Sequence, residues 1–424
     1  MYSNKVFESK REIGLFCLFC LFVLAFNLAI KFYEFKGFKA DRYEILQAKV
    51  LQSYLKTNEK GKTYRVLRLK TGNFILYTTT KADFEPEINS KILLRPIKNK
   101  LTFIDYLSRS FYLPNFGILE IRYSENSKYL DKFREKIYDF ISNQHDISKA
   151  KELYTALFLA TPISKELRSD VNHFAIAHLI AISGYHLGII FGFLYFILHH
   201  IYRYFQARFF PFRSEKFDLS IVIFIFLFGY LMLIDFVPSF LRAFLMSLLI
   251  FYMLSRNVRI ISFEALFILI AFAVSFMPSL LFSIGFYLSC AGVFYIYLYL
   301  HHFGDKFSNL AHVILLNLWV YLAMIIPILY FFPLISFQQF AVLPLSLIFV
   351  IFYPLGLVLH LLNLGGIFDE NLIWFLELRT DSVNLDINLY IFLIYNILSL
   401  ISIKNRNLAL LLVFSNLFCF ISLL

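Results

Sequence analysis

The chain has 424 residues, of which 59% are hydrophobic, 19% aromatic and 16% charged, with a formal net charge of +11. This composition excludes an ordinary soluble globular protein, because apolar runs of roughly 18 residues or more, long enough to span a bilayer, separate the charged blocks. The sequence predicts a polytopic α-helical membrane protein with about 8–10 membrane segments, some of them re-entrant or broken.

The first apolar run, Ile13–Tyr33, follows a basic flank of Lys5, Lys10 and Arg11. It is longer than the apolar region of a typical signal peptide, and no small-x-small cleavage site follows it. We therefore interpret residues 1–33 as a cytoplasmic tip and a retained membrane anchor.

Residues 34–116 form a basic, β-type block. Positions 36–100 hold 15 Lys and Arg against 6 Asp and Glu, which indicates a polyanionic partner such as nucleic acid, phospholipid headgroups or a teichoic-type polymer. A soluble domain from a lysine-rich proteome is the alternative. Four runs rich in β-branched and aromatic residues are separated by turn residues: Tyr43–Lys56, Thr63–Lys70, Phe74–Thr80 and Lys91–Ile97.

These runs predict a small all-β, OB-like extracytoplasmic domain, a fold whose usual ligands are single-stranded nucleic acids or oligosaccharides. Alternation along Thr63–Lys70 places Arg65 on the opposite face from Arg68. The side chains expected to bind DNA are Lys62, Tyr64, Arg65, Arg68, Lys70 and Tyr77.

The sequence predicts no cofactor, no metal site and no enzyme activity. All four cysteines lie in apolar segments, so no disulfide is expected in the basic block. Gly61-Lys62-Thr63 resembles the end of a phosphate-binding loop, but Lys56 occupies the position of the upstream glycine. The chain is therefore not expected to hydrolyse ATP.

Residues 117–170 are interpreted as a charged linker that becomes an amphipathic helix at the membrane surface. Spans are expected at 173–200, 218–234, 240–254, 261–277, 286–300, 309–331, 339–361, 385–402 and 407–424. The basic loops 203–216 and 256–259 are expected in the cytoplasm, which places residues 36–165 outside.

Strict alternation then puts the acidic loop 369–381 and the basic residues 404–406 on the wrong sides of the membrane. One span is therefore expected to be re-entrant or to lie flat. The first suspect is 339–361, because it contains Pro344 and Pro354.

The most polar apolar run is 174–192. Polar groups at membrane depth usually face a bundle interior or a water-filled path, and glycines four residues apart share one helix face that allows close approach. The run holds His178, Ser183, Gly184, His186, Gly188 and Gly192. Ser183-Gly184 also resembles the serine turn of an intramembrane protease, but Ala181 replaces the first glycine and no orienting group is visible.

Arg242 lies just inside a predicted span, three residues after Ser239 and seven after Asp235. An arginine there needs a carboxylate, a phosphate or carbonyl oxygens. Two interpretations stay open: an ion pair with Asp235 that fixes a kink, and a phosphate contact in a pore. A further break is expected at 278–289, where Pro, Ser and Gly interrupt the apolar sequence.

Four stretches together resemble the ComEC family of competence channels, in that family's order and approximate spacing. They are His178–Gly188, the Pro-Ser-x-x-Arg-Ala-x-x-Met run at 238–246, the Pro-x-x-x-Phe-Ser-x-Gly-Phe-x-Leu-Ser run at 278–289, and the proline-interrupted region 327–356. The resemblance covers roughly 150–360 strongly and the basic β block more loosely. It implies a channel core at 171–363, followed by C-terminal membrane segments at 364–424.

The resemblance implies an inner-membrane channel that passes single-stranded DNA into the cytoplasm during natural transformation. The residues expected along the membrane path are His178, Ser183, Gly184, His186, Gly188, Ser239, Arg242, Gly285 and Ser289. The implied partners are single-stranded DNA, the lipid bilayer, a periplasmic DNA receptor and a cytoplasmic ATPase, and a homodimer stays open.

Many members of the family end in a metallo-β-lactamase-like domain with a His-x-His-x-Asp-His signature. The sequence has no such signature, so we expect a short form without nuclease activity. Two alternatives remain: a transporter of a polyanionic or lipid-linked glycan polymer and, more remotely, an intramembrane hydrolase.

Overall fold

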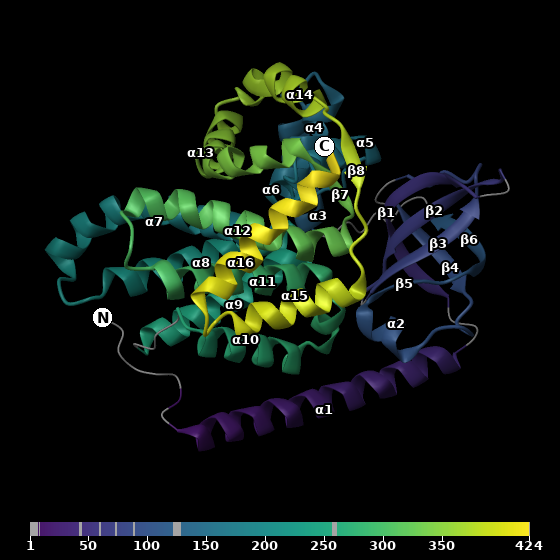
Figure 1. Cartoon of the computed structure of the whole chain (residues 1–424). Coiled ribbons are helices and arrows are strands. Elements are labelled where there is room, and N and C mark those ends of the chain that lie inside the picture. Colours follow the sequence, from purple (N-terminus) through teal and green to yellow (C-terminus); the bar gives the residue numbers. More distant parts are fainter. Residues whose placement is uncertain are drawn as a thin grey trace. The chain divides into compact units, whose positions relative to one another are not determined.

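The computed structural model describes residues 7, 9–41, 45–58, 61–72, 74–87, 90–121, 129–256 and 261–423. Lys5, Tyr43 and the loop residues 257–259, discussed above, lie outside this set. The chain forms two compact units (Figure 1). The sheet unit comprises Phe7–Tyr129 and Phe267–Tyr287, and the helical unit comprises Leu130–Leu266 and Leu288–Leu424.

The sheet unit combines one long helix with a six-stranded sheet. Its elements are α1 (Lys10–Ala40), β1 (Leu46–Thr57), β2 (Thr63–Lys70), β3 (Ile75–Lys81), β4 (Lys91–Pro96), α2 (Phe103–Ser108), β5 (Ser110–Tyr112), β6 (Asn115–Ile121) and the 3-10 turn η1 (Pro278–Phe282). The strand order is β5-β3-β2-β1-β4-β6.

The sheet curls on itself through a bent strand. β5 pairs with β3, whereas β6 pairs with β4 at the other end of the sheet. Only Leu113 and Pro114 separate β5 from β6, and the Asn115 amide donates to Thr78 Oγ1 at 2.7 Å. The predicted small all-β domain is confirmed as this curled sheet. Its OB-like identity stays a prediction.

Helix α1 is packed directly onto the sheet unit's core. Phe35 and Phe38, near its C-terminal end, contact Tyr106 of α2 in tilted ring pairs with centroids 5.7 Å apart. The buried Lys98 ammonium donates to Phe38 O at 2.8 Å and to Asp41 O at 2.9 Å, which satisfies carbonyls that the helix end leaves without partners.

The helical unit contains most of the remaining elements. They are α3 (Tyr129–Ser142), α4 (Ser148–Leu159), α5 (Lys165–His173), α6 (Ala177–Ile180), α7 (Gly184–Phe209), α8 (Glu215–Leu233), α9 (Pro238–Ser255), α10 (Phe263–Phe276), α11 (Ile284–Phe303), α12 (Asn309–Phe331), β7 (Leu334–Ser336), η2 (Phe337–Ala341), α13 (Val342–Leu361), η3 (Gly365–Phe368), α14 (Asp369–Glu377), β8 (Ser382–Asn384), α15 (Leu389–Ile401), α16 (Arg406–Ser415) and η4 (Asn416–Leu423). Helices α10 and α11 are divided between the two units.

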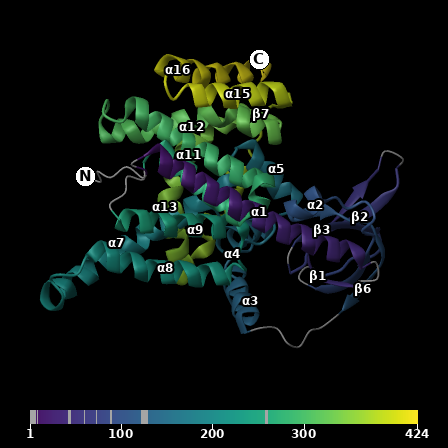
Figure 2. The same ribbon diagram turned by 90° about the horizontal axis from the view of Figure 1, so that it is seen from below.

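Within the described ranges, seven helical segments are long and apolar enough to cross a membrane. They are α1, α7, α8, α9, α11, α12 and Phe337–Leu361, and three shorter apolar helices accompany them. The protein is therefore a multi-pass α-helical membrane protein, as the composition predicts. Figure 2 shows α7 beside α8, and α15 and α16 beside α12.

Several predicted spans are shorter in the structure, among them 261–277, where α10 has 14 residues. The loops predicted at 203–216 and 369–381 are both in part helical. α15 has 13 residues and rises about 20 Å, less than the roughly 30 Å of hydrocarbon in a bilayer. The span predicted at 407–424 changes from α16 to the 3-10 turn η4. The acidic loop predicted at 369–381 begins with α14, so simple loop alternation does not apply to this region.

The proline-interrupted span is a continuous helix. Pro354 lies inside α13, while Pro344 is in its first turn, where the missing N–H has no intrahelical acceptor to lose. Pro327 is likewise accommodated inside α12. The sequence therefore overestimates how far these prolines break the backbone.

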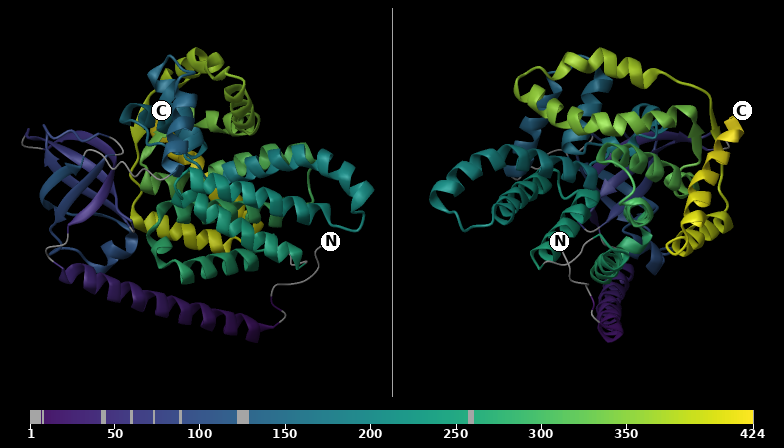
Figure 3. Two further views of the ribbon diagram at one scale, coloured as in Figure 1. Left: turned by 180° about the vertical axis from the view of Figure 1, so that it is seen from behind. Right: turned by 60° about the vertical axis from the view of Figure 1, so that its left-hand side comes forward.

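Helix α4 lies in the core of one hydrophobic cluster of the helical unit. An amphipathic surface helix was expected here, but most of α4 is buried, including Leu153, Tyr154, Phe158 and Leu159. It packs beside α13 and α14 (Figure 3). The charged residues expected on the linker lie instead on α3, which precedes it.

Candidate functional site

The polar run at 174–192 is not one helix, because the chain turns at Ala181–Ser183 before α7 begins. Ser183 is the N-cap residue, and its Oγ accepts from Tyr185 N at 3.3 Å. Its own N–H donates to His186 Nδ1 at 3.3 Å. Together these contacts form a capping box, which satisfies N–H groups at the start of a helix.

The expected span at 173–200 is therefore wrong in its first ten residues. His178 lies on the short helix α6, and its Nδ1 is 3.0 Å from Ala175 O. His186, by contrast, is fully buried, with its ring edge-on to Phe349 and Tyr353 of α13. The two histidines that the sequence places on one helix are thus on different elements.

Two of the polar motifs meet at the start of α7. Ser239 Oγ, in the first turn of α9, donates to Ile182 O. A Cβ on Gly184 would lie 3.3 Å from the Cβ of Ala243. This is tighter than ordinary van der Waals contact, so a glycine suits the close approach of α7 and α9. We call Ile182–Gly184 with Ser239–Ala243 the α7–α9 junction.

Arg242 is part of this junction. It precedes Ala243 on α9 and is partly buried. Ser183, Gly184 and Ser239 thus meet at the junction, and Arg242 lies on the α9 segment that forms it. Ser289 lies on α11.

A groove runs along α7 from the junction. Gly184, Gly188 and Gly192 line it, and its volume is about 460 Å³. Its other lining residues are Tyr185, Ile189, Phe193 and Phe196 of α7 and Val350 and Pro354 of α13. The lining holds aromatic and small side chains and no charged one, so it offers stacking surfaces without fixed charge.

Gly285 lies in the first turn of α11, after the predicted break. The 3-10 turn η1 occupies 278–282, and Ser283 Oγ then accepts from Phe286 N at 3.2 Å. This break is confirmed as a turn between α10 and α11. Gly285 belongs to the sheet unit and is not part of the α7–α9 junction.

The sheet unit places most of the predicted DNA-binding residues on one outer face. Strand pairing sets Arg68 opposite Tyr77, and Tyr64 opposite Lys81 on β3 and Lys56 on β1. Side chains at directly paired positions point to the same face of a sheet. We call this surface, with Tyr64, Arg68, Lys70, Tyr77, Lys56, Lys81 and Tyr112, the basic–aromatic face. Lys62 precedes β2 in the exposed turn.

Arg65 does not belong to this face, so its predicted role in DNA binding has no geometric support. Its side chain is 8% exposed and donates to Ala82 O, to Ser53 Oγ and to Glu85 Oε1, the last at 2.8 Å. Alternation alone indicates the opposite side of β2. The three partners explain why a charged side chain is stable there.

Sequence reasoning missed three members of the face. Lys56 and Lys81 become neighbours of Tyr64 only through the strand register. Tyr112 pairs with Tyr77 in the parallel β3–β5 ladder, and its OH is 3.0 Å from Thr79 Oγ1. Strand register is not readable from a single sequence, although the alternation of each strand is.

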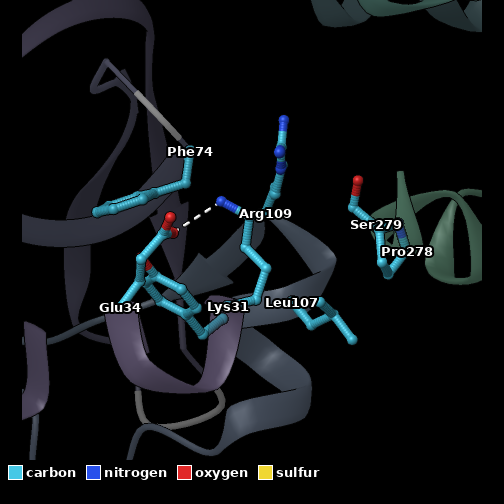
Figure 4. A pocket seen from close by; sticks show the side chains of 8 residues that line it. Lys31, Glu34, Phe74, Leu107, Arg109, Pro278 and Ser279 are labelled. Atoms are coloured by element: carbon cyan, nitrogen blue, oxygen red, sulfur yellow. Dashed lines mark hydrogen bonds and ion pairs between the residues drawn. The ribbon is translucent and has the colours of Figure 1, made fainter. Parts of the chain in front are cut away.

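A small pocket in the sheet unit is of a different kind (Figure 4). It is lined by α1, α2 and η1 residues and has a volume of about 40 Å³, room for little more than a water molecule. Lys31 and Glu34 form an ion pair at 2.7 Å across it, and Arg109 points away from that pair. The pocket is too small to hold a nucleotide.

Residues 160–424 match the family described as Competence protein. The chain belongs to the Competence protein family. The matched region contains the α7–α9 junction and the groove, and the sheet unit's strands precede it. Neither the characterised protein sequences nor the solved structures give a match.

The resemblance to the ComEC-type competence proteins is thereby confirmed at the level of the family. Membership assigns the protein to DNA uptake, and the seven long apolar helices of the described part make it a multi-pass membrane protein. The junction, the groove and the basic–aromatic face therefore belong to a membrane protein of a DNA-uptake family.

Proposed function

We propose that this protein is an inner-membrane channel that passes one strand of DNA into the cytoplasm during natural transformation. The observation that carries the proposal is the α7–α9 junction, inside the region that matches the competence family. The α9 side of this junction carries the partly buried Arg242, and a groove of glycines and aromatic rings begins at Gly184 on its α7 side. Phosphates need a cation, and bases stack on aromatic side chains without regard to sequence.

The basic–aromatic face supports an outer receiving role. Across β1, β2 and β3 the face sets tyrosines beside cations: Tyr64 is paired with Lys56 and Lys81, and Tyr77 is paired with Arg68. Lys70 adds a further cation at the end of β2. Cations beside stacking side chains are the usual composition of surfaces that bind single strands without sequence preference. The proposal makes the face the first contact of the incoming strand.

The chain acts without enzyme chemistry in this proposal. The Ser183 hydroxyl and the His186 imidazole cap α7, so the pair that resembles a nucleophile and its base is engaged in backbone contacts. A cytoplasmic ATPase and a periplasmic DNA receptor complete the proposal, because the sequence contains no phosphate-binding loop of its own.

The proposal is tested by following labelled DNA in a strain whose own gene is deleted and replaced by wild type or by Arg242→Ala. We expect the variant to keep periplasmic label and to lose most cytoplasmic label and most transformants. Arg256→Ala is the matched control, because Arg256 is the exposed C-cap of the same helix. Normal transformation by Arg242→Ala at normal protein level would remove Arg242 from the mechanism.

The alternative cargo is a polyanionic or lipid-linked glycan. The full chain in nanodiscs distinguishes the two, since single-stranded DNA and an oligosaccharide can be titrated in parallel. DNA affinity that falls steeply with salt supports the proposal. Binding of the oligosaccharide alone would favour glycan transport.

A further inference from the structure

Three buried titratable side chains form a hydrogen-bonded chain in the helical unit, away from the junction residues. His145 Nδ1 lies 3.0 Å and 2.9 Å from the two carboxylate oxygens of Asp369. His145 Nε2 lies 3.0 Å from His360 Nε2, and His360 Nδ1 lies 2.6 Å from Gly356 O. More than 200 residues of sequence separate His145 from either partner.

This hydrogen-bonded chain of Asp369, His145 and His360 is enclosed by protein. The His145 side chain has no exposed surface, and Asp369 and His360 are 5% and 3% exposed. Tyr154 of α4 stacks on His145 at 4.6 Å between ring centroids, and Gln144 donates to His360 O. A Cβ on Gly365 would lie 2.8 Å from the His360 ring and from Gln144 Oε1, so only glycine allows η3 to cover the chain.

Counting hydrogens shows what these distances require. Gly356 O can only accept, so His360 Nδ1 carries a hydrogen. The contact between the two Nε2 atoms needs one more, and the contact between His145 and Asp369 needs a third. An aspartate with two neutral histidines supplies only two. With two, some contact in the chain sets a lone pair against a lone pair whichever tautomers are chosen.

We infer that Asp369, His145 and His360 form a buried binding site for one proton, and that release of this proton opens a contact in the chain. With the third hydrogen the group has no net charge, which suits its burial. Without it, a negative charge stays in an apolar surrounding and one contact becomes repulsive. The contact that opens lies between the α3–α4 turn, the end of α13 and the start of α14. The inference goes beyond DNA import and does not rest on it.

The surroundings of Asp369 favour its protonated form. Burial raises the pKa of Asp369 above its ordinary value, although the His145 contact acts in the other direction. Burial also raises the pKa of Tyr154, so its phenol stays neutral over the physiological range. The exposed carboxylate of Asp146 adds to the rise in the pKa of Asp369.

A metal ion is a poorer occupant. A metal needs ligand atoms that converge on one point, whereas here each ring nitrogen already faces its neighbour in a line. Across the described residues, no group of three or more His, Cys, Asp or Glu side chains is arranged to hold a metal. The geometry is that of a proton chain.

The Asp369→Asn variant tests whether the bound proton causes the pH dependence. The variant's amide can donate to His145 Nδ1, His145 Nε2–H can then donate to His360, and every contact is satisfied with two neutral histidines. The fold is retained and the pH dependence is removed. Asp146→Asn is the matched control, because it removes the neighbouring carboxylate without touching the chain.

The measurement is hydrogen–deuterium exchange of the full chain in nanodiscs, followed in peptides that cover residues 356–370 from about pH 6 to about pH 9. The folded state binds one proton more than the unfolded state above the ordinary histidine pKa of about 6.5, so its stability falls as pH rises. After correction for intrinsic exchange, wild type and Asp146→Asn should open more at higher pH, by up to about tenfold per pH unit. Asp369→Asn should stay flat.

Either a flat wild-type profile or an unchanged dependence in Asp369→Asn overturns the inference. If Asp369→Asn fails to fold, histidine ¹⁵N spectra of the wild-type protein show whether the two histidines share one proton. Two of the ten histidines should change their ring-nitrogen signals together in a single step. Independent titration of His145 and His360 contradicts a shared proton, and DNA import is not needed for either readout.

Discussion

The two units arrange their polar residues in opposite ways. The sheet unit places several cations on one outer face of its sheet and buries few, among them Arg65 and Lys98, each with two or more oxygen partners. The helical unit keeps charge off its groove and concentrates polar groups where helices break, as at Ser183. A surface that captures a polyanion benefits from fixed charge, while a path that must release it does not.

The largest expected effect comes from overfilling the junction. Gly184→Val adds a branched side chain where a Cβ would already lie 3.3 Å from Ala243, which should cost about 1–3 kcal/mol of stability and abolish DNA import. Gly229→Val is the control, since nothing lies within 4 Å of a Cβ there. Protein level and transformation frequency measure both. Equal import by the two variants would mean that close packing of α7 and α9 is dispensable.

Substitutions of the two β2 arginines should have different effects: loss of the buried Arg65 should lower stability, and loss of the outward-facing Arg68 should weaken DNA binding. Arg65→Ala leaves the oxygens of Ala82 and Ser53 without their donor and should lower stability by about 1–3 kcal/mol. Arg68→Ala should leave stability unchanged. Thermal unfolding of the full chain in detergent is the measurement, and a stable Arg65→Ala variant that loses DNA binding would reverse these assignments.

On the basic–aromatic face, stacking of a base on Tyr64 should contribute more to DNA binding than a single cation does. Tyr64→Ala is expected to weaken single-strand binding by about 1–3 kcal/mol, whereas Tyr64→Phe keeps the ring and should bind nearly as wild type. Fluorescence anisotropy with an unstructured oligonucleotide measures the difference. Similar losses in both variants would indicate that the hydroxyl, and not the ring, makes the contact.

The smallest expected effect is on salt dependence. Lys81→Ala removes one cation opposite Tyr64, so the slope of log affinity against log salt should become shallower by about 0.7 for a single-stranded ligand. Lys100→Ala, outside the sheet, is the control. A slope unchanged in Lys81→Ala would move the phosphate path off this face.

Much of the fold follows from the sequence because long apolar runs have few alternatives in a membrane. The same reasoning failed at Ser183, where a serine three residues before His186 caps a helix inside an apolar run. Apolar content reports burial in lipid, whereas a helix start depends on local hydrogen bonds. The available signal is local: a serine followed three residues later by a side chain that accepts from its N–H.

The candidate sites, like the fold, follow from the sequence only in part. Alternation along β2 separates Arg65 from Arg68 correctly, but the pairing of Tyr64 with Lys81 depends on register. His145 and Asp369 are 224 positions apart, and neither belongs to a recognisable motif. Contacts of that sequence separation follow from the packing of α4 against α14, which no local pattern encodes.

The Lys98 contacts at the end of α1 have a mechanical consequence. Because this ammonium and the rings of Phe35 and Phe38 join α1 to the sheet core directly, a pull on a strand held by the sheet is transmitted to a helix 31 residues long. Under the proposed function, lipid around α1 would resist that pull, and the helix would brace the sheet unit against tension on the bound DNA strand.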